Sequence, residues 1–278
     1  MIVFWALASA MAGTLPKGSQ HIYSGASYGT WSSFESKGSE KSLPQGAQVS
    51  QLLSHTQYSY GMKDGIELSV FLPVSSVSVS QMSVPTTTGI GQVGVSSKFD
   101  LWGMDTLGIT GQVGLTTGAF HSEERGKLTN IGDGSTQVHL GLSGSSVWEV
   151  SSAYVHLNAR GGYIAKMPSN LDFNPKYPAD DLTYGLNVGG RYRGYSLSVF
   201  IDGFYRLDGV DYPAPTTVDS IEGFTALKAS QLKVGVSDSI SWNSWSLSGY
   251  VAKSVLAKNN PMDEMIGGIG IGYYIQPQ

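Results

Sequence analysis

Short segments of alternating polarity run through the chain and constrain its fold more than any other feature. In residues 107–115 apolar side chains alternate with Gly and polar ones, and similar segments recur between Gly18 and Ile275. A period of two is typical of a β-strand with one apolar face. The connections between the segments alternate between very short turns and long polar loops. The loops of a soluble sandwich have no reason to segregate by length in this way. The pattern predicts an all-β fold, a closed antiparallel transmembrane β-barrel with short periplasmic turns and long extracellular loops.

The composition agrees with a membrane-spanning sheet. Only 14% of the 278 residues are charged, whereas about 25% is usual in soluble proteins. No run of about 18 apolar residues follows the first twelve positions, which excludes helical membrane spans. Every backbone amide must find a partner in lipid, so such a chain crosses as a closed sheet. The absence of Cys excludes disulfides and thiolate metal sites, and the net charge of -4 argues against a nucleic-acid partner.

The first twelve residues are apolar and end in small side chains. Ala8 and Ala10, or Ala10 and Ala12, fit the small-residue pattern of an export cleavage site. No Lys or Arg precedes the stretch, unlike the basic start of an ordinary signal peptide, and a buried strand or helix is the alternative. We expect residues 1–12 to be a truncated or atypical signal peptide and residues 13–278 to form a single barrel domain.

Alternation and length together predict about twelve strands that are long enough to cross a membrane at a tilt. An even number places both chain ends on one side of the membrane. The expected strands are residues 19–33, 50–62, 66–74, 89–101, 106–118, 135–147, 152–164, 182–192, 195–206, 229–242, 245–254 and 264–275.

The connections between these strands alternate in length. The short connections are residues 63–65, 102–105, 148–151, 193–194 and 243–244. The long ones are residues 34–49, 75–88, 119–134, 165–181, 207–228 and 255–263. We expect the short turns on the periplasmic side and the long loops on the outer side.

One face of each strand is apolar, as in Ile66, Leu68, Val70 and Leu72, and is expected to face lipid. Indole and phenol rings favour the headgroup region, because one end is apolar and the other forms hydrogen bonds. Aromatic residues also occur at strand ends in soluble sheets, so the prediction depends on their repetition. The expected membrane-interface residues beside the short connections are Trp102, Trp148, Tyr192, Tyr195, Trp242 and Trp245.

Two residues fit this assignment poorly, and the faces of one strand are ambiguous. Asp238 and Lys253 both fall on the face expected to meet lipid, where a charge at midplane depth costs a few kcal/mol. Either they lie near the interface or a bulge shifts the register. The first strand is ambiguous, because Tyr23 and Trp31 lie on the face opposite Tyr28.

The opposite face is polar and rich in Gly and Ser, which leave space for a narrow, partly hydrated lumen. The expected lumen and selectivity residues are Lys98, Gln112, His139, His156, Asn158, Arg160, Asn187, Arg191, Asp202, Arg206 and Lys233. The cations among them outnumber Glu67, Asp100 and Asp202, the acids of this face. This excess predicts a mild attraction for small anions. The alternative is that the charges pair across strands and fill the interior.

Catalytic and metal sites are weakly indicated. Barrel enzymes need a Ser/His pair or an Asp/His set at one rim. Ser54 precedes His55 and His121 precedes Ser122, but adjacent residues of a strand point to opposite faces. His139 and His156 are expected to be inward-facing neighbours on adjacent strands, as an ordinary polar pair rather than a metal or proton site. We therefore expect no enzyme, no metal and no cofactor.

Several stretches of the chain carry a family resemblance: residues 14–18, 61–73, 111–118 and 132–136. With these stretches the chain resembles the meta-pathway phenol-degradation family of outer-membrane transporters. The resemblance covers the chain after residue 12, and its motifs are strand and turn patterns. It implies a barrel in the outer membrane of a Gram-negative bacterium that helps small organic compounds, including aromatic ones, to cross. Such barrels usually end on an aromatic residue, whereas here Tyr274 is followed by four further residues.

These observations predict an outer-membrane channel for the passive uptake of small organic solutes, aromatic or anionic. Its expected partners are outer-membrane lipid, the solutes and the outer-membrane assembly machinery, with no nucleic acid. Selectivity is expected in the inward side chains and in loops 165–181 and 207–228. One alternative is a structural or surface-interaction barrel with a filled lumen, and a weaker one is an enzyme at the barrel rim.

Overall fold

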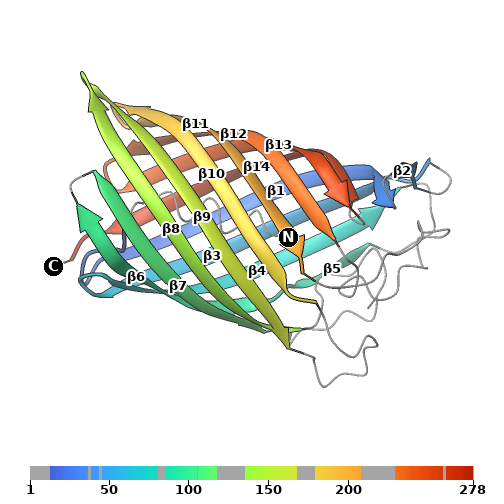
Figure 1. The fold of residues 1–278 in the computed structure, drawn as a ribbon, viewed down its shortest axis with the longest axis horizontal. Coiled ribbons are helices and arrows are strands. Elements are labelled where there is room, and N and C mark those ends of the chain that lie inside the picture. The colour runs from blue at the N-terminus through green and yellow to red at the C-terminus, as the bar shows by residue number, and fades with distance from the viewer. Residues whose placement is uncertain are drawn as a thin grey trace.

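Twelve long antiparallel strands and two short ones form one continuous sheet (Figure 1). The computed structural model describes residues 13–36, 39–43, 46–80, 86–104, 106–117, 135–167, 179–207, 229–258 and 261–277. No helix in this part of the chain is long and apolar enough to span a membrane. The strands are β1 (Gln20–Ser36), β2 (Ser39–Ser42), β3 (Val49–Lys63), β4 (Ile66–Val79), β5 (Thr87–Ile90), β6 (Val93–Met104), β7 (Leu107–Thr117), β8 (Thr136–Val150), β9 (Ala153–Met167), β10 (Asp181–Tyr192), β11 (Tyr195–Arg206), β12 (Ser230–Trp242), β13 (Trp245–Lys258) and β14 (Pro261–Ile275).

The sheet closes because its last strand pairs with its first. β14 runs antiparallel to β1 from Gln20↔Ile275 to Phe34↔Pro261, and every other long strand pairs with its sequence neighbour among the long strands. A closed sheet has no edge that exposes unpaired N–H and C=O groups. The predicted closed all-β barrel of twelve long strands is confirmed.

The short connections lie together at one end of the barrel. Arg193 and Gly194, which join β10 to β11, both have positive φ angles of 47° and 85°. This is the backbone of a type I′ turn, whose twist matches that of the flanking strands. Because the chain enters β1 and leaves β14 at this same end, we call it the short-turn end, which is periplasmic in outer-membrane barrels.

Four expected loops are partly strand, among them loop 165–181. The expected loop 34–49 contains the end of β1, all of β2 and the first residue of β3. The expected loop 75–88 contains the end of β4 and half of β5, and the expected loop 255–263 contains the end of β13 and the start of β14. The expected strand 89–101 is interrupted, because Gly91 and Gln92 separate β5 from β6. The N–H of Gly91 donates to the carbonyl of Pro73 at 3.0 Å. In an antiparallel ladder the N–H and C=O of one residue point to the same neighbouring strand. Pro73 has no N–H, so it offers only its carbonyl on the side that faces Gly91, and one ladder hydrogen bond is lost there.

Some predictions fall where the structure gives no description. Residues 1–12, the expected signal peptide, lie outside the described residues, as do most of the expected loops 119–134, 165–181 and 207–228. Where loop 165–181 is described, its first residues belong to β9 and its last to β10. The extent of the signal peptide therefore stays a prediction.

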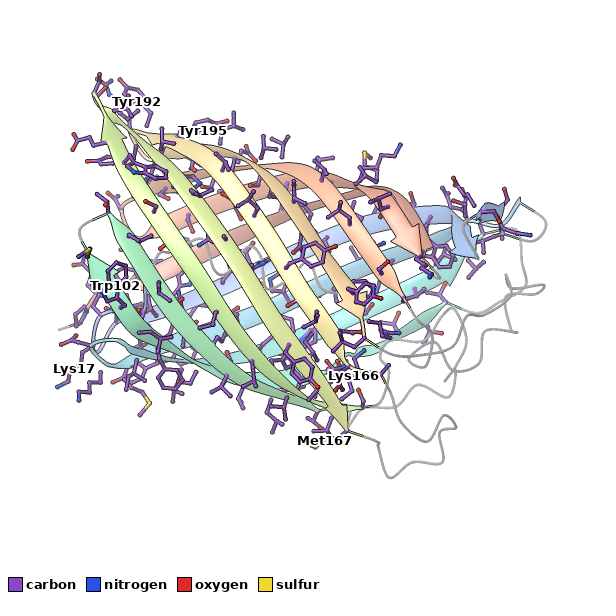
Figure 2. All side chains as sticks on the ribbon, in the orientation of Figure 1. Lys17, Trp102, Lys166, Met167, Tyr192 and Tyr195 are labelled. Atoms are coloured by element: carbon purple, nitrogen blue, oxygen red, sulfur yellow. The ribbon has the colours of Figure 1, made fainter. Side chains whose placement is uncertain are left out.

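Exposed apolar side chains cover the outer face, as the alternation predicts (Figure 2). In β1, Tyr23 and Trp31 point inward and are buried, whereas Tyr28 points outward and is exposed. The face of β1 that carries Tyr23 and Trp31 is therefore the inner one, and the face that carries Tyr28 is the outer one.

Asp238 and Lys253 both occupy outward, exposed positions, so no register shift moves them inward. A bulge does interrupt the pairing of β12 with β13, but it lies beyond Lys253. Lys253 is eight residues from Trp245 at the short-turn end, about 20 Å in depth for a tilted strand, which brings its ammonium near the far interface. Asp238 is four residues from Trp242 and lies about 10 Å deep, where its carboxylate is costly.

The polarity of β4 inverts along the strand. Up to Val74 its outward positions are apolar. Beyond it, the outward positions hold Ser76 and Ser78. The inward positions hold Val77 and Val79, which are buried. The apolar part, from Ile66 to Val74, spans about 20 Å in depth, close to the apolar band of roughly 25 Å in outer-membrane barrels.

Above the inversion, the inner face carries a small hydrophobic core. Leu43 and Ala47, from the connection between β2 and β3, cover this face and are 3% and 0% exposed. The N–H of Leu43 donates to the carbonyl of Ser32 at 2.8 Å, which pins the connection to β1. The complete cluster comprises Trp31, Leu43, Ala47, Val49, Val77 and Val79.

Large inward side chains lie flat across glycines of a neighbouring strand. A Cβ atom at each of these glycines would overlap the ring that covers it. Such ring-on-glycine packing covers a backbone that has no side chain of its own and fixes the register of the strands. The pairs are Tyr23 over Gly270, His55 over Gly25, Tyr250 over Gly268 and Phe200 over Gly235.

We expect Gly270→Val to lower the free energy of unfolding by about 1–3 kcal/mol, because the new side chain displaces the Tyr23 ring. Urea unfolding in lipid vesicles measures the change. Gly144→Ala is the control, because nothing lies within 4 Å of a Cβ at that position. The double variant Tyr23→Ser/Gly270→Val should recover much of the loss, and a double variant as unstable as Gly270→Val contradicts the explanation.

Candidate functional site

The inner face of the barrel divides into two walls. On the contiguous strands β6 to β10, seven of the inward polar side chains are half-buried, whereas others, such as Thr110, Gln137 and Asp181, are buried. On the remaining strands, the larger inward side chains are mostly buried. We call the seven half-buried side chains the polar lining; it comprises Lys98, Gln112, His139, His156, Asn158, Arg160 and Asn187.

The expected lumen residues lie on the inner face by the strand alternation, since their neighbours along each strand belong to the outer face. Asp202, Arg206 and Lys233 are more buried than the polar lining, with exposures of 3–8%. Arg191 lies exposed near the short-turn end. The alternation therefore placed these side chains on the correct face, but it did not separate the half-buried ones from the packed ones.

The packed wall consists of aromatic rings in contact. The Tyr23 and His55 ring centroids are 5.3 Å apart, and those of His55 and Phe71 are 5.7 Å apart. Further round the barrel, Phe200 meets Tyr250 edge-on at 6.3 Å. Tilted and edge-on arrangements of this kind are favourable for aromatic pairs. The rings leave the polar lining as the more accessible side of the lumen.

Arg160 and Asp202 pair across an intervening strand. Arg160 lies on β9, Asp202 on β11, and Nη2 of the arginine is 2.5 Å from Oδ1 of the aspartate. Between them on β10 is Gly185, where a Cβ would come within 2.6 Å of the Arg160 Nε. The missing side chain thus opens the route by which the guanidinium reaches its partner. Lys233 of β12 is the register partner of Asp202 on its other side.

A second charged group lies at the long-loop end, where Asp181 begins β10. Its carboxylate accepts from Arg206 Nε at 2.7 Å and lies 2.6 Å from Lys166 Nζ. The three side chains are at most 10% exposed. Next to them, Asp180 accepts hydrogen bonds from the Tyr163 hydroxyl and, at 2.9 Å, from the Lys166 backbone N–H. Sequence reasoning missed Lys166 and Asp181 because it assigned residues 165–181 to a loop.

These contacts bear on the expected attraction for anions. Arg160 and Arg206 each face a carboxylate, and Lys98 donates to the carbonyl of Gly13. Lys166 adds a cation and Asp181 an acid, so the excess of cations over acids on this face stays at two. The arrangement matches the alternative in which the inner charges pair across strands.

His139 and His156 are not neighbours, which corrects the expected pair. His139 is in register with Gly114 and Ile164, whereas His156 is in register with Val147 and Gly189. The two positions are eight residues apart along the β8–β9 ladder, about 26 Å. His139 instead bonds Thr116 Oγ1 through Nε2 at 3.1 Å. Within the described ranges, no group of three or more metal-binding side chains comes together.

His156 lies in a set of side chains that superficially resembles a catalytic triad. Its Nε2 is 3.1 Å from Ser198 Oγ and 3.1 Å from Asn187 Oδ1. In a Ser-His-Asn triad the two partners occupy different ring nitrogens, so that one takes the serine proton while the other orients the ring. Here both meet the same nitrogen, which suits a polar wall better than an activated nucleophile.

The adjacent Ser/His pairs are equally unsuited. Ser54 is exposed on the outer face, while His55 is buried on the inner one. His121 and Ser122 lie outside the described residues.

The expected interface aromatics are all exposed, with fractions of 42–47%. Figure 2 shows Trp102, Tyr192 and Tyr195 near the short-turn end. Trp102 and Trp148 lie within β6 and β8 rather than in the expected turns, because both strands extend further than predicted. Their role at the membrane interface stays a prediction, as it does for Trp242 and Trp245.

The closed twelve-strand barrel, apolar outside and polar inside, has the fold of bacterial outer-membrane barrels. Similar to it is the COG4313 outer membrane channel from Pseudomonas putida F1, with a TM-score of 0.73 and 16% identity over 96% of this chain and 98% of that one. The translocator domain of the autotransporter NalP from Neisseria meningitidis is also similar, with a TM-score of 0.53 and 12% identity over 92% and 88%. The NanC porin has a TM-score of 0.52 and 9% identity over 90% and 98%.

No family model matches the chain, and no curated protein matches it. The resemblance to the meta-pathway phenol-degradation family therefore stays a prediction from sequence. At these identities the solved structures establish the fold alone.

We expect Asp181→Asn to lower the free energy of unfolding by about 3–5 kcal/mol, because it leaves the buried Lys166 and Arg206 without their carboxylate. Glu149→Gln, at an exposed position near the short-turn end, is the control and should change stability little. Urea unfolding in vesicles compares the two variants. Equal stabilities would show that Asp181 does not hold the cations in place.

Proposed function

We propose that the protein is a passive channel for small organic solutes in the outer membrane of a Gram-negative bacterium. The polar lining carries this proposal, because it forms a half-buried polar surface on contiguous strands inside a closed barrel. Solutes would move along β6 to β10, off the barrel axis, because rings pack the opposite wall. Likeness in fold to the outer membrane channel from Pseudomonas putida F1 and to the NanC porin supports the same role.

The solute class follows from the chemistry of the polar lining. Gln112, Asn158 and Asn187 offer amide donors and acceptors, which suit hydroxyl and carbonyl groups. Arg160 is paired with Asp202, so its charge is largely compensated. We therefore favour uncharged small organic molecules, aromatic ones included, over anions.

The outer face fits the expected lipid partner. Exposed apolar side chains cover it, and the Trp245 and Tyr273 rings are in tilted contact near the end of β14, with centroids 4.5 Å apart. Tyr274, the adjacent ring, bonds Ser19 at 2.8 Å. We propose that Tyr273, on the same face as Trp245, is the aromatic residue that the outer-membrane assembly machinery meets.

The second candidate is a structural or surface-interaction barrel with a filled lumen. The burial of the aromatic wall and the small core at the long-loop end favour it. The two candidates differ in conductance, because a filled lumen passes no ions. An enzyme at the rim is a third and weaker candidate, and a lipid- or peptide-cleavage assay addresses it.

We expect the protein to form channels in planar bilayers, and Asn158→Trp to reduce the single-channel conductance by at least about twofold, because an indole would project into the narrow polar path. Leu157→Trp is the matched control, since Leu157 is the adjacent residue on the outer face. Absence of conductance in the unmodified protein favours the filled barrel. Equal conductance in the two variants would place the path elsewhere.

A salt gradient across the same bilayer tests the solute class. Compensated charges predict a reversal potential close to zero, whereas uncompensated lysines and arginines in the path predict a clear anion preference. A strong anion preference would overturn our assignment of uncharged solutes and restore the anionic class.

A further inference from the structure

The residues before β1 lie against the inner wall at the short-turn end. We call residues 13–19 the N-terminal strap. The strap is fixed to β3 by two backbone hydrogen bonds, from Gly18 N–H to the Gly61 carbonyl at 2.7 Å and from Gly61 N–H to the Ser19 carbonyl at 2.9 Å. Leu15 is only 5% exposed, and Ser19 is fully buried. The strap is therefore a packed part of the barrel.

The strap continues over two further strands. The backbone N–H of Leu15 donates to Glu67 Oε2 of β4 at 3.1 Å. Thr14 donates to Asp100 of β6 through its N–H at 3.1 Å and through its hydroxyl at 2.8 Å. Lys98, also of β6, donates to the carbonyl of Gly13. The strap thus crosses the inner wall from β3 to β6, where the polar lining begins.

Gly61 of β3 makes this crossing possible. A Cβ at this position would overlap the carbonyl oxygen of Pro16 and lie 2.8 Å from that of Leu15. Its φ is not in the left-handed region, so the backbone of β3 itself accepts any residue there. The absence of a side chain at Gly61 therefore serves the strap rather than the strand.

The strap also changes which charges face the lumen. Glu67 and Asp100 accept hydrogen bonds from its N–H and hydroxyl groups, and Lys98 donates to its carbonyl. Charged groups held in this way are compensated by backbone dipoles rather than by passing ions. Glu67, Asp100 and Lys98 carry a formal net charge of -1 in either case, but without the strap the two carboxylates would lose these donors and face the mouth directly.

We propose that the N-terminal strap forms the constriction at the short-turn mouth and tunes its electrostatics by holding the Glu67 and Asp100 carboxylates in hydrogen bonds. This inference rests on the proposed channel function. It assigns to residues 13–19 the role of a selectivity element. Displacing the strap should widen the mouth and make it attractive to cations.

Gly61→Val is the first test, because its side chain occupies the space of Pro16. We expect the single-channel conductance and the cation-to-anion permeability ratio each to rise roughly twofold in planar bilayers. Gly144→Ala, with open space at its Cβ, is the control and should match the unmodified protein. Triple replacement Gly61→Val/Glu67→Gln/Asp100→Asn should keep the larger conductance and lose the cation preference, which separates size from charge.

A second variant leaves the strands unchanged. Leu15→Pro removes the N–H that donates to Glu67, and it lies outside the barrel strands, so we expect the strands to pair as in the unmodified protein. It should shift conductance and permeability in the same direction as Gly61→Val, by a smaller factor. If the unmodified protein conducts and both variants match it, the strap is not the constriction. If no protein conducts, the proposed channel function itself fails.

Discussion

Pairing of β14 with β1 is the constraint on which the rest of the structure depends. A sheet in lipid must satisfy all of its backbone N–H and C=O groups internally, and only closure does this for every strand. Closure then decides the polarity of each side chain, since alternate residues face lipid or lumen. It also brings the residues before β1 and the end of β14 together, as in the contact between Ser19 and Tyr274. The strap at the mouth follows from this proximity.

Inside the barrel, glycine determines how far a large side chain can reach. Gly270 and Gly268 let tyrosine rings lie flat on β14, and Gly185 lets Arg160 cross β10 to Asp202. Packing of this kind removes volume on one side of the lumen and leaves half-buried amides and imidazoles on the other. The rings that pack on glycine thus give one wall a different character from the other. For the proposed channel, this asymmetry places the path along β6 to β10.

Much of the fold could be predicted, because alternation and turn length are local signals. The strands that the sequence predicts too short show the limit of these signals. Beyond Val74 the polarity of β4 inverts, so the outward residues are no longer apolar and the alternation predicts a loop there. At the site, the inward positions of Gln112 or Asn158 followed from alternation. Their partners did not, since Arg160 meets Asp202 across a third strand and Lys166 meets Asp181 only in the folded barrel. Gly61 carried no sequence signal, because the contact that requires it is with residues 15 and 16.

The inversion within β4 has a consequence for how the protein sits in its surroundings. A barrel with a uniformly greasy exterior could slide along the bilayer normal at little cost. Here, a barrel that sank by two residues of β4 would bring serine hydroxyls into hydrocarbon. A barrel that rose by the same amount would bring leucine into water, so both displacements are unfavourable. The rim above this level holds its shape through an internal cluster around Trp31 and Ala47, as a small water-soluble domain does. One continuous strand therefore has a lipid-facing part and a water-facing part, and the boundary between the two parts fixes the depth of the barrel in the membrane.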